Sequence, residues 1–373
     1  MKQKVTIGII ILIFTAGCKQ EYIPPVEESQ KSLLVVEGNL NPGPDSTVIR
    51  LTRTQALADA SGIKIENNAQ LSVEGKDNSI RFLTGRGNGY YVSPDLNLII
   101  NNEYRLRIKT ANGKEYLSDF VKARMAPDID SIGWHRNSDG VNIYVNTGDP
   151  TNGTRYYRWE YAETWEIHSV FGPNVIYENG VIRNRIFPQE NVSVCWKNSL
   201  SSSVLITNTT RLEQDMVNEQ PLVFIPLGDE KLSFRYSIFV KQYAMDADSY
   251  AFYELLKKNT EDIGSFFGPQ PSEIKGNLHG VTVPDEFVVG YVTASTVSTK
   301  RIFITGAEVQ WPFRTGCEEI RVPNNRDSIQ YAISAGLMPF AYLCCPPNEY
   351  LFSTSECVDC TKRGGSNVKP SYW

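Results

Sequence analysis

The chain has 373 residues, a net charge of −5 and a hydrophobic fraction of 41%. This mild charge argues against a nucleic-acid-binding protein, which would need clustered basic residues. The length is enough for two or three domains, and no segment after the N-terminal one is apolar for long enough to cross a bilayer as a helix. The 19 Tyr, 16 Phe and 6 Trp favour β structure, because aromatic side chains are enriched in strands.

The N-terminal segment has the pattern of a secretory signal peptide. Lys2 and Lys4 precede an apolar run at 5–14, and small residues follow directly before Cys18. The run is too short to span a membrane, so we expect cleavage after residues 1–17. A cysteine right after Ala-Gly resembles the lipobox of bacterial lipoproteins, in which acyl chains such as palmitate are attached to the thiol. We therefore predict lipidation at Cys18, with a chance cysteine after an ordinary signal as the alternative.

Residues 18–30 are polar and contain Pro24-Pro25, which is typical of an extended tether. Apolar and polar residues then alternate along 31–126 in the two-residue rhythm of strands. For example, Tyr104 and Ile108 face one way while Arg105 faces the other, and an Asn-Gly corner follows. We expect an N-terminal β-sandwich of immunoglobulin-like or fibronectin-like size.

The second predicted unit, 127–305, is another sandwich of this type with one inserted helix at about 246–260. Asp246 or Asp248 can cap that helix, which carries a broad apolar stripe. An aromatic-rich strand at 156–168 places one row of side chains on a single face: Tyr157, Trp159, Tyr161, Trp165 and Ile167. Such a row most often fills a core, although it can also stack on sugar rings or peptide side chains.

The C-terminal segment, 306–373, is rich in cysteine, and we expect it to pack on the second unit. Thiols oxidise outside the cytoplasm, so six cysteines are disulfide candidates: Cys195, Cys317, Cys344, Cys345, Cys357 and Cys360. A zinc site made of the last four thiolates is the alternative, but adjacent cysteines are poorly spaced for a tetrahedral metal. The sequence leaves the pairing open.

Several short segments resemble one group of bacterial proteins, the Bacteroidota lipoproteins classified as domain of unknown function 4249. Besides the lipobox, these segments are 34–38, 157–159, 276–280, 289–295, 357–361 and the tail 364–373. The resemblance implies an outer-membrane lipoprotein, often encoded beside a TonB-dependent receptor, without an established activity. Lys19-Gln20-Glu21 also resembles the surface-export signals of that phylum, which favours the cell surface over the periplasmic face.

Two further sets of candidate residues come from local patterns. Ser46, Ser131 and Ser328 lie in Asp-Ser triplets that resemble the short O-glycosylation signal of exported proteins in that phylum. If a ligand-binding face exists, aromatics on loops are its best candidates, namely Tyr90, Tyr91, Phe266 and Phe267.

We find no catalytic motif in the sequence. The three histidines lack HExxH spacing, and there is no GxSxG elbow or phosphate loop, so we expect no catalytic residues, metal or cofactor. An oxygen-rich loop at 149–153 has too few carboxylates for a typical calcium loop. We expect a non-catalytic accessory protein that binds substrate for, or caps, a TonB-dependent transporter. The alternatives are a structural or adhesive envelope protein and a glycan or peptide hydrolase.

Overall fold

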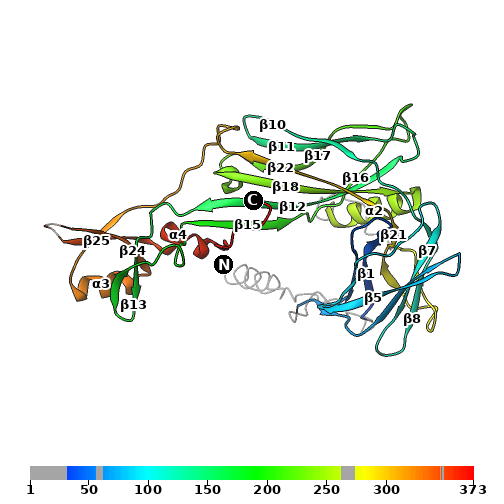
Figure 1. The fold of residues 1–373 in the computed structure, drawn as a ribbon, viewed down its shortest axis with the longest axis horizontal. Helices are drawn as coiled ribbons and strands as arrows, with labels where there is room; N and C mark the ends of the chain where they lie inside the picture. The colour runs from blue at the N-terminus through cyan, green and yellow to red at the C-terminus, as the bar shows by residue number, and fades with distance from the viewer. Residues whose placement is uncertain (1–31, 56–61, 262–273, 345, 347) are drawn as a thin grey trace, which may run out of the picture.

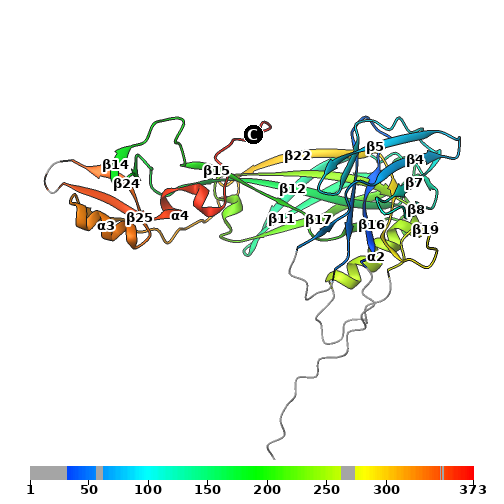
Figure 2. The same cartoon turned by 90° about the horizontal axis from the view of Figure 1, so that it is seen from below.

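The computed structural model describes residues 32–55, 62–261, 274–344, 346 and 348–373. The fold is mainly β, with 48% strand and 11% helix. Three parts follow one another along an elongated body, as Figures 1 and 2 show. We call them the barrel unit (β1–β9 and β19–β21), the sandwich unit (β10–β12, β15–β18 and β22) and the distal module (β13, β14, β23–β25, α3 and α4). Within the described residues, no helix has the length and apolar character needed to cross a membrane.

The barrel unit is a single 12-stranded sheet that nearly closes on itself. Its strands are β1 (Leu34–Leu40), β2 (Thr47–Arg53), β3 (Lys64–Ile65), β4 (Gln70–Gly75), β5 (Ile80–Gly87), β6 (Tyr90–Ser93), β7 (Glu103–Lys109), β8 (Glu115–Ser118), β9 (Val121–Lys122), β19 (Leu278–Gly280), β20 (Val288–Gly290) and β21 (Thr293–Ala294). The main path runs β19-β8-β7-β4-β5-β6-β2-β1-β20. We expected two packed sheets here, but β5 pairs with both β4 and β6, so hydrogen bonding continues around the unit.

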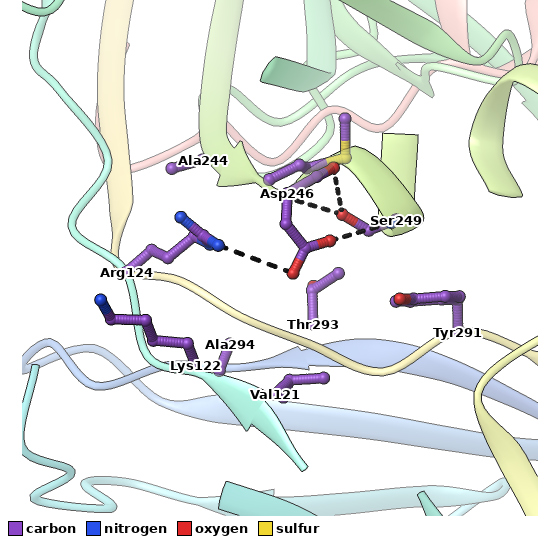
Figure 3. Close-up of a pocket in the computed structure, with 10 residues that line it drawn as sticks. Val121, Lys122, Arg124, Ala244, Asp246, Ser249, Tyr291, Thr293 and Ala294 are labelled. Atoms are coloured by element: carbon purple, nitrogen blue, oxygen red, sulfur yellow. Dashed lines mark hydrogen bonds and ion pairs between the residues drawn. The ribbon is translucent and has the colours of Figure 1, made fainter. Parts of the chain in front are cut away.

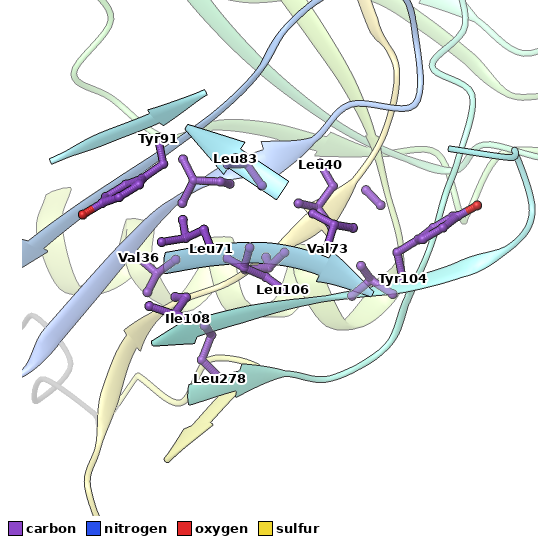
Figure 4. Close-up of a cluster of buried hydrophobic side chains, with 14 of the residues drawn as sticks. Val36, Leu40, Leu71, Val73, Leu83, Tyr91, Tyr104, Leu106, Ile108 and Leu278 are labelled. Carbon is purple, nitrogen blue, oxygen red and sulfur yellow. The ribbon is translucent and has the colours of Figure 1, made fainter. Parts of the chain in front are cut away.

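One continuous apolar core fills this barrel, and Figure 4 shows its side chains pointing inward from opposite walls. Tyr104, Leu106 and Ile108 are 2%, 0% and 0% exposed, as their alternation along the sequence predicts. The alternation of apolar and polar residues within a strand therefore determines which side chains face the barrel core.

The seam of the barrel lies between β19 and β20. Asn277, directly before β19, donates its side-chain amide to the Val292 carbonyl at 2.9 Å and accepts from the Val292 amide at 2.8 Å. Gly290 has φ +133°, and a Cβ there would lie 2.1 Å from the Val36 carbonyl oxygen of β1. Only glycine tolerates this close parallel pairing, which seals one edge of the sheet.

The strand pairing differs from the division we expected at residue 127. Residues 278–294 pair with β8 and β1 of the barrel unit, although they follow the whole of the sandwich unit's strand β18 in sequence. The barrel unit is therefore discontinuous in the chain. Without residues 278–294, β1 and β8 would be edge strands with unpaired backbone groups, and this later segment of the chain pairs with both.

The sandwich unit packs a three-stranded sheet against a five-stranded one over a shared core. The first contains β10 (Ile129–Arg136), β11 (Gly140–Gly148) and β17 (Met216–Pro226). The second contains β15 (Val194–Leu200), β12 (Tyr156–His168), β18 (Arg235–Met245) and β22 (Val297–Thr305), with β16 (Leu205–Asn208) beside β12. Tyr157 and Trp159 of β12 are 0% and 1% exposed. The aromatic row thus fills the core and is not available for stacking on a ligand.

The helix α2 (Ala247–Glu261) lies where the sequence predicts it. Asp246 accepts a hydrogen bond from the Ser249 backbone amide at 2.9 Å, which caps the first turn. Phe252 is 8% exposed and anchors the helix on the body.

The distal module combines two distant segments of the chain. The hairpin β13 (Val175–Glu178) and β14 (Val181–Asn184) joins a sheet of β23 (Ile320–Pro323), β25 (Glu349–Thr354) and β24 (Leu337–Leu343). The helices α3 (Arg326–Ser334) and α4 (Ser355–Val358) and the 3-10 turns η1 (Glu230–Leu232) and η2 (Cys360–Arg363) complete the described elements. The middle of the C-terminal segment therefore builds a module with 169–192. Its first part, through Val309 and Trp311, and its last part, through Cys360 and the tail, pack on the sandwich unit as expected.

The tail 366–373 lies on the outer face of the five-stranded sheet. Trp373 donates its indole N–H to Glu166 at 2.8 Å, and the Arg235 guanidinium lies 5.2 Å from its ring centre. Tyr372 stacks on Arg301 at 3.8 Å. Alternating cations and aromatic rings thus attach the tail to the sheet.

Candidate functional site

Two disulfides cross-link the distal module and its connections. Cys195 on β15 is bonded to Cys360, and Cys317 is bonded to Cys357 on α4. This pairing resolves what the sequence left open, and it contradicts the zinc alternative because two of the four required thiols are already bonded elsewhere. Cys344 is exposed next to the distal tip, and Cys345 lies outside the described residues.

The four aromatic residues predicted as ligand contacts differ in their exposure to solvent. Tyr90 is 40% exposed, and the Arg50 guanidinium lies 5.3 Å from its ring centre. Tyr91 is only 1% exposed, and its hydroxyl donates to the Glu66 carbonyl at 2.9 Å. Neighbours in a strand face opposite sides, so Tyr91 belongs to the barrel core and its prediction as a ligand contact is wrong. Phe266 and Phe267 lie outside the described residues.

The three candidate glycosylation serines occupy different settings. Ser46 is exposed in the loop between β1 and β2, and Ser131 is exposed on β10, where its hydroxyl accepts a hydrogen bond from Asn146 at 2.9 Å. Ser328 is half-buried in the first turn of α3, and its amide donates to the capping Asn325 side chain. Their modification stays a prediction.

The polar groups that we considered for chemistry have local structural partners. His168 contacts Glu166 at 2.6 Å and stacks on Phe234 at 3.7 Å between ring centres. Burial would raise the pKa of Asp149, but hydrogen bonds from Thr151 and the following turn outweigh burial and hold that pKa below its ordinary value. The described part of the chain contains no group of three or more His, Cys, Asp or Glu side chains placed to hold a metal ion.

A small pocket lies at the junction between the barrel and sandwich units (Figure 3). Its volume is about 10 Å³, which is room for about one water molecule. Asp246 faces Arg124 across it, with 3.8 Å between carboxylate and guanidinium. Burial raises the pKa of the Tyr291 hydroxyl, and the nearby Asp246 and Asp248 carboxylates raise it further. This pocket is a polar joint between the two units and is too small for a ligand.

A larger hollow of about 450 Å³ lies at the end of the barrel where β1 begins. It is lined by Ser32, Arg53, Lys114, Val283, Asp285 and Glu286. Its two cations are paired with carboxylates: Arg53 bonds to Glu66 at 2.5 Å, and Lys114 bonds to Glu286 at 2.7 Å. Sequence reasoning missed this hollow, because its walls come from four separate segments that only barrel closure brings together.

Tyr116 lies buried beside this hollow at 1% exposure. Burial raises the pKa of its hydroxyl, and the neighbouring Glu286 carboxylate raises it further, whereas Arg53 lowers it. The hydroxyl therefore stays protonated at neutral pH. The hollow offers charges of both signs beside an exposed valine.

Comparison with known protein families matches residues 19–301 to "Domain of unknown function (DUF4249)". The match covers well over half of the chain. The chain belongs to the DUF4249 family. No curated protein matches it significantly. In this DUF4249 protein the matched residues contain the barrel unit, the sandwich unit up to β22 and the hairpin β13–β14. The sheet β23–β25 and three of the four bonded cysteines follow the matched residues in the sequence.

Proposed function

We propose that this protein is a non-catalytic lipoprotein of the outer membrane that faces the cell surface and assists a TonB-dependent transporter by binding its substrate or capping its pore. The observation that carries the proposal is the basic, short apolar and small-residue pattern that ends at Cys18. The chain also belongs to the DUF4249 family, and the sequence resemblance to that family implies such lipoproteins.

The build of the body supports a role by contact. Three parts in a row are joined by buried contacts, and the disulfide Cys195–Cys360 ties the distal module to the sandwich core, where both cysteines are 0% exposed. An elongated body of this kind holds its distal module away from the barrel unit, which is the part joined to the anchor (Figures 1 and 2). The two-layer packing of the sandwich unit also fits the immunoglobulin-like type, which many cell-surface proteins use.

The distal module offers the best contact surface for a protein partner. Four large apolar side chains are exposed on three of its segments: Val181 (61%), Ile186 (63%), Phe187 (48%) and Tyr331 (77%). Exposed apolar side chains are common where proteins bind one another, because burial on binding removes them from water. We therefore place the transporter contact on this module.

Co-purification tests the proposal. A tagged copy should retain a transporter barrel in mild detergent, and the double variant Phe187→Asp/Tyr331→Asp should lose it. The control is Phe82→Asp, which changes an equally exposed aromatic (73%) on the barrel unit and should leave the complex intact. A clean monomer from the unmodified chain contradicts the transporter role. Lost adhesion with normal uptake in a deletion strain would instead favour the structural alternative.

A further inference from the structure

Exposed aliphatic side chains gather at one end of the barrel unit. Ile63 and Ile65, on the segment that forms β3, are 63% and 40% exposed. Val281 and Val283, in the connection from β19 to β20, are 45% and 41% exposed. Leaving four such side chains in water is unfavourable, so a cluster of them at one end indicates a surface that is covered in the functional protein.

Strand pairing places both segments at the same end. Ile65 pairs with Thr52 near the end of β2, and the Val281 amide donates to the Glu115 carbonyl at the start of β8 at 2.8 Å. Val283 also lines the 450 Å³ hollow together with Ser32 and Arg53. Val283 therefore lies at that hollow, and the other three aliphatic residues lie at the same end of the barrel unit.

The chain enters the described body at this same end. Ser32 donates its hydroxyl to the Thr54 carbonyl at 3.4 Å, and its own carbonyl accepts from Arg53 at 2.8 Å. Residues 19–31, thirteen in all, separate Ser32 from Cys18. Even fully extended, they span about 45 Å, so an acylated Cys18 keeps this end of the barrel within that distance of the bilayer.

We propose that this end of the barrel unit docks on the surface of the membrane that holds the acylated Cys18, with Ile63, Ile65, Val281 and Val283 resting among the lipid headgroups. The inference rests on the lipid anchor of the proposed function. Since the anchor already holds the two surfaces close, a weak apolar contact is enough to orient the body. The lining cations Arg53 and Lys114 are paired with carboxylates, so docking depends on apolar contact and little on anionic lipid.

Photo-crosslinking in vesicles tests the docking. The acylated full chain, with benzoylphenylalanine in place of Ile63 or Val283, is reconstituted in vesicles of zwitterionic phospholipid and irradiated, and adducts are identified by mass. The matched control position is Leu200, which is 76% exposed on the sandwich unit. We expect lipid adducts at 63 and 283 in several-fold excess over those at 200, with little change when anionic lipid is added.

A second variant separates docking from mere proximity. With the probe at 283, Ile63→Asp should reduce the lipid adduct several-fold, whereas Leu200→Asp should not, and neither should change the melting temperature because both side chains are exposed. Equal lipid yields at all positions, or adducts to a second copy of this chain or another protein, overturn the docking. A chain that carries no acyl group overturns the anchor, and the docking with it; an acylated chain without the adduct overturns the docking alone.

Discussion

Removing the disulfide between Cys195 and Cys360 should destabilise the protein strongly. The two residues are separated by 165 positions in the sequence, and both are 0% exposed in the sandwich core. Closing a loop of this length restricts the unfolded chain by about 5 kcal/mol at 25 °C on the chain-entropy estimate. The double variant Cys195→Ala/Cys360→Ala should therefore lose about 5 kcal/mol of unfolding free energy, a large part of the total for an ordinary domain.

The measurement is urea unfolding of oxidised protein, followed by far-UV circular dichroism and by tryptophan fluorescence. The matched comparison is Cys317→Ala/Cys357→Ala, whose cysteines are separated by 40 positions. The same estimate gives about 4 kcal/mol for this shorter loop. Because Cys317–Cys357 lies wholly among distal-module segments, its loss should unfold that module first and leave the barrel transition in place. A change of less than about 1 kcal/mol in the first variant would refute the role assigned to its cross-link.

Three further predictions follow from single contacts. Gly290→Ala should cost about 2 kcal/mol or more by pushing β20 away from β1, whereas Gly113→Ala, with open space around the new methyl group, should cost about 1 kcal/mol for its positive φ. Thermal unfolding compares the two variants. Hydrogen bonds from Arg183 lower the pKa of Glu190 to about 2. A depressed carboxyl pKa stabilises the fold at pH values above the unfolded pKa near 4, and this contribution disappears as the pH falls towards 2. An NMR titration should find the Glu190 midpoint near pH 2, and Arg183→Gln should raise this midpoint. Deleting Trp373 should lower the unfolding free energy by about 2 kcal/mol, because its edge-to-face contact with Phe303, its contact with the Arg235 guanidinium and one indole hydrogen bond are lost. An unchanged urea midpoint would contradict this.

Local patterns in the sequence predicted much of the secondary structure. Alternation along β7 placed Tyr104 and Ile108 inside, and the same alternation placed Tyr157 and Trp159 in the sandwich core. The capped apolar stripe that begins near Asp246 predicted α2 within a residue at each end. These features depend on interactions between near neighbours, which a single sequence records directly.

Long-range pairing was not predictable in this way. The short strands β19–β21 have no sequence pattern that predicts their pairing with β8 and β1. The pairing of β20 with β1 also depends on the close backbone approach that Gly290 permits. The disulfide partners were open for the same reason. Tyr91 was predicted as a loop residue because its glycine-rich surroundings are typical of loops. It lies instead on the short strand β6, where its neighbour Tyr90 faces outward. The hollow beside Ser32 required the closed barrel before its walls could be recognised.

The discontinuity of the barrel unit constrains how the protein can form during synthesis. Strands β1 and β8 emerge early, but their partners at 278–294 are added only after more than 150 further residues have been made. Until then a nascent chain displays two open strand edges, which invite pairing with other chains. If the chain is exported, as we propose, its folding should wait until translocation is complete, and chaperones of the secretion route should protect these edges in the interval.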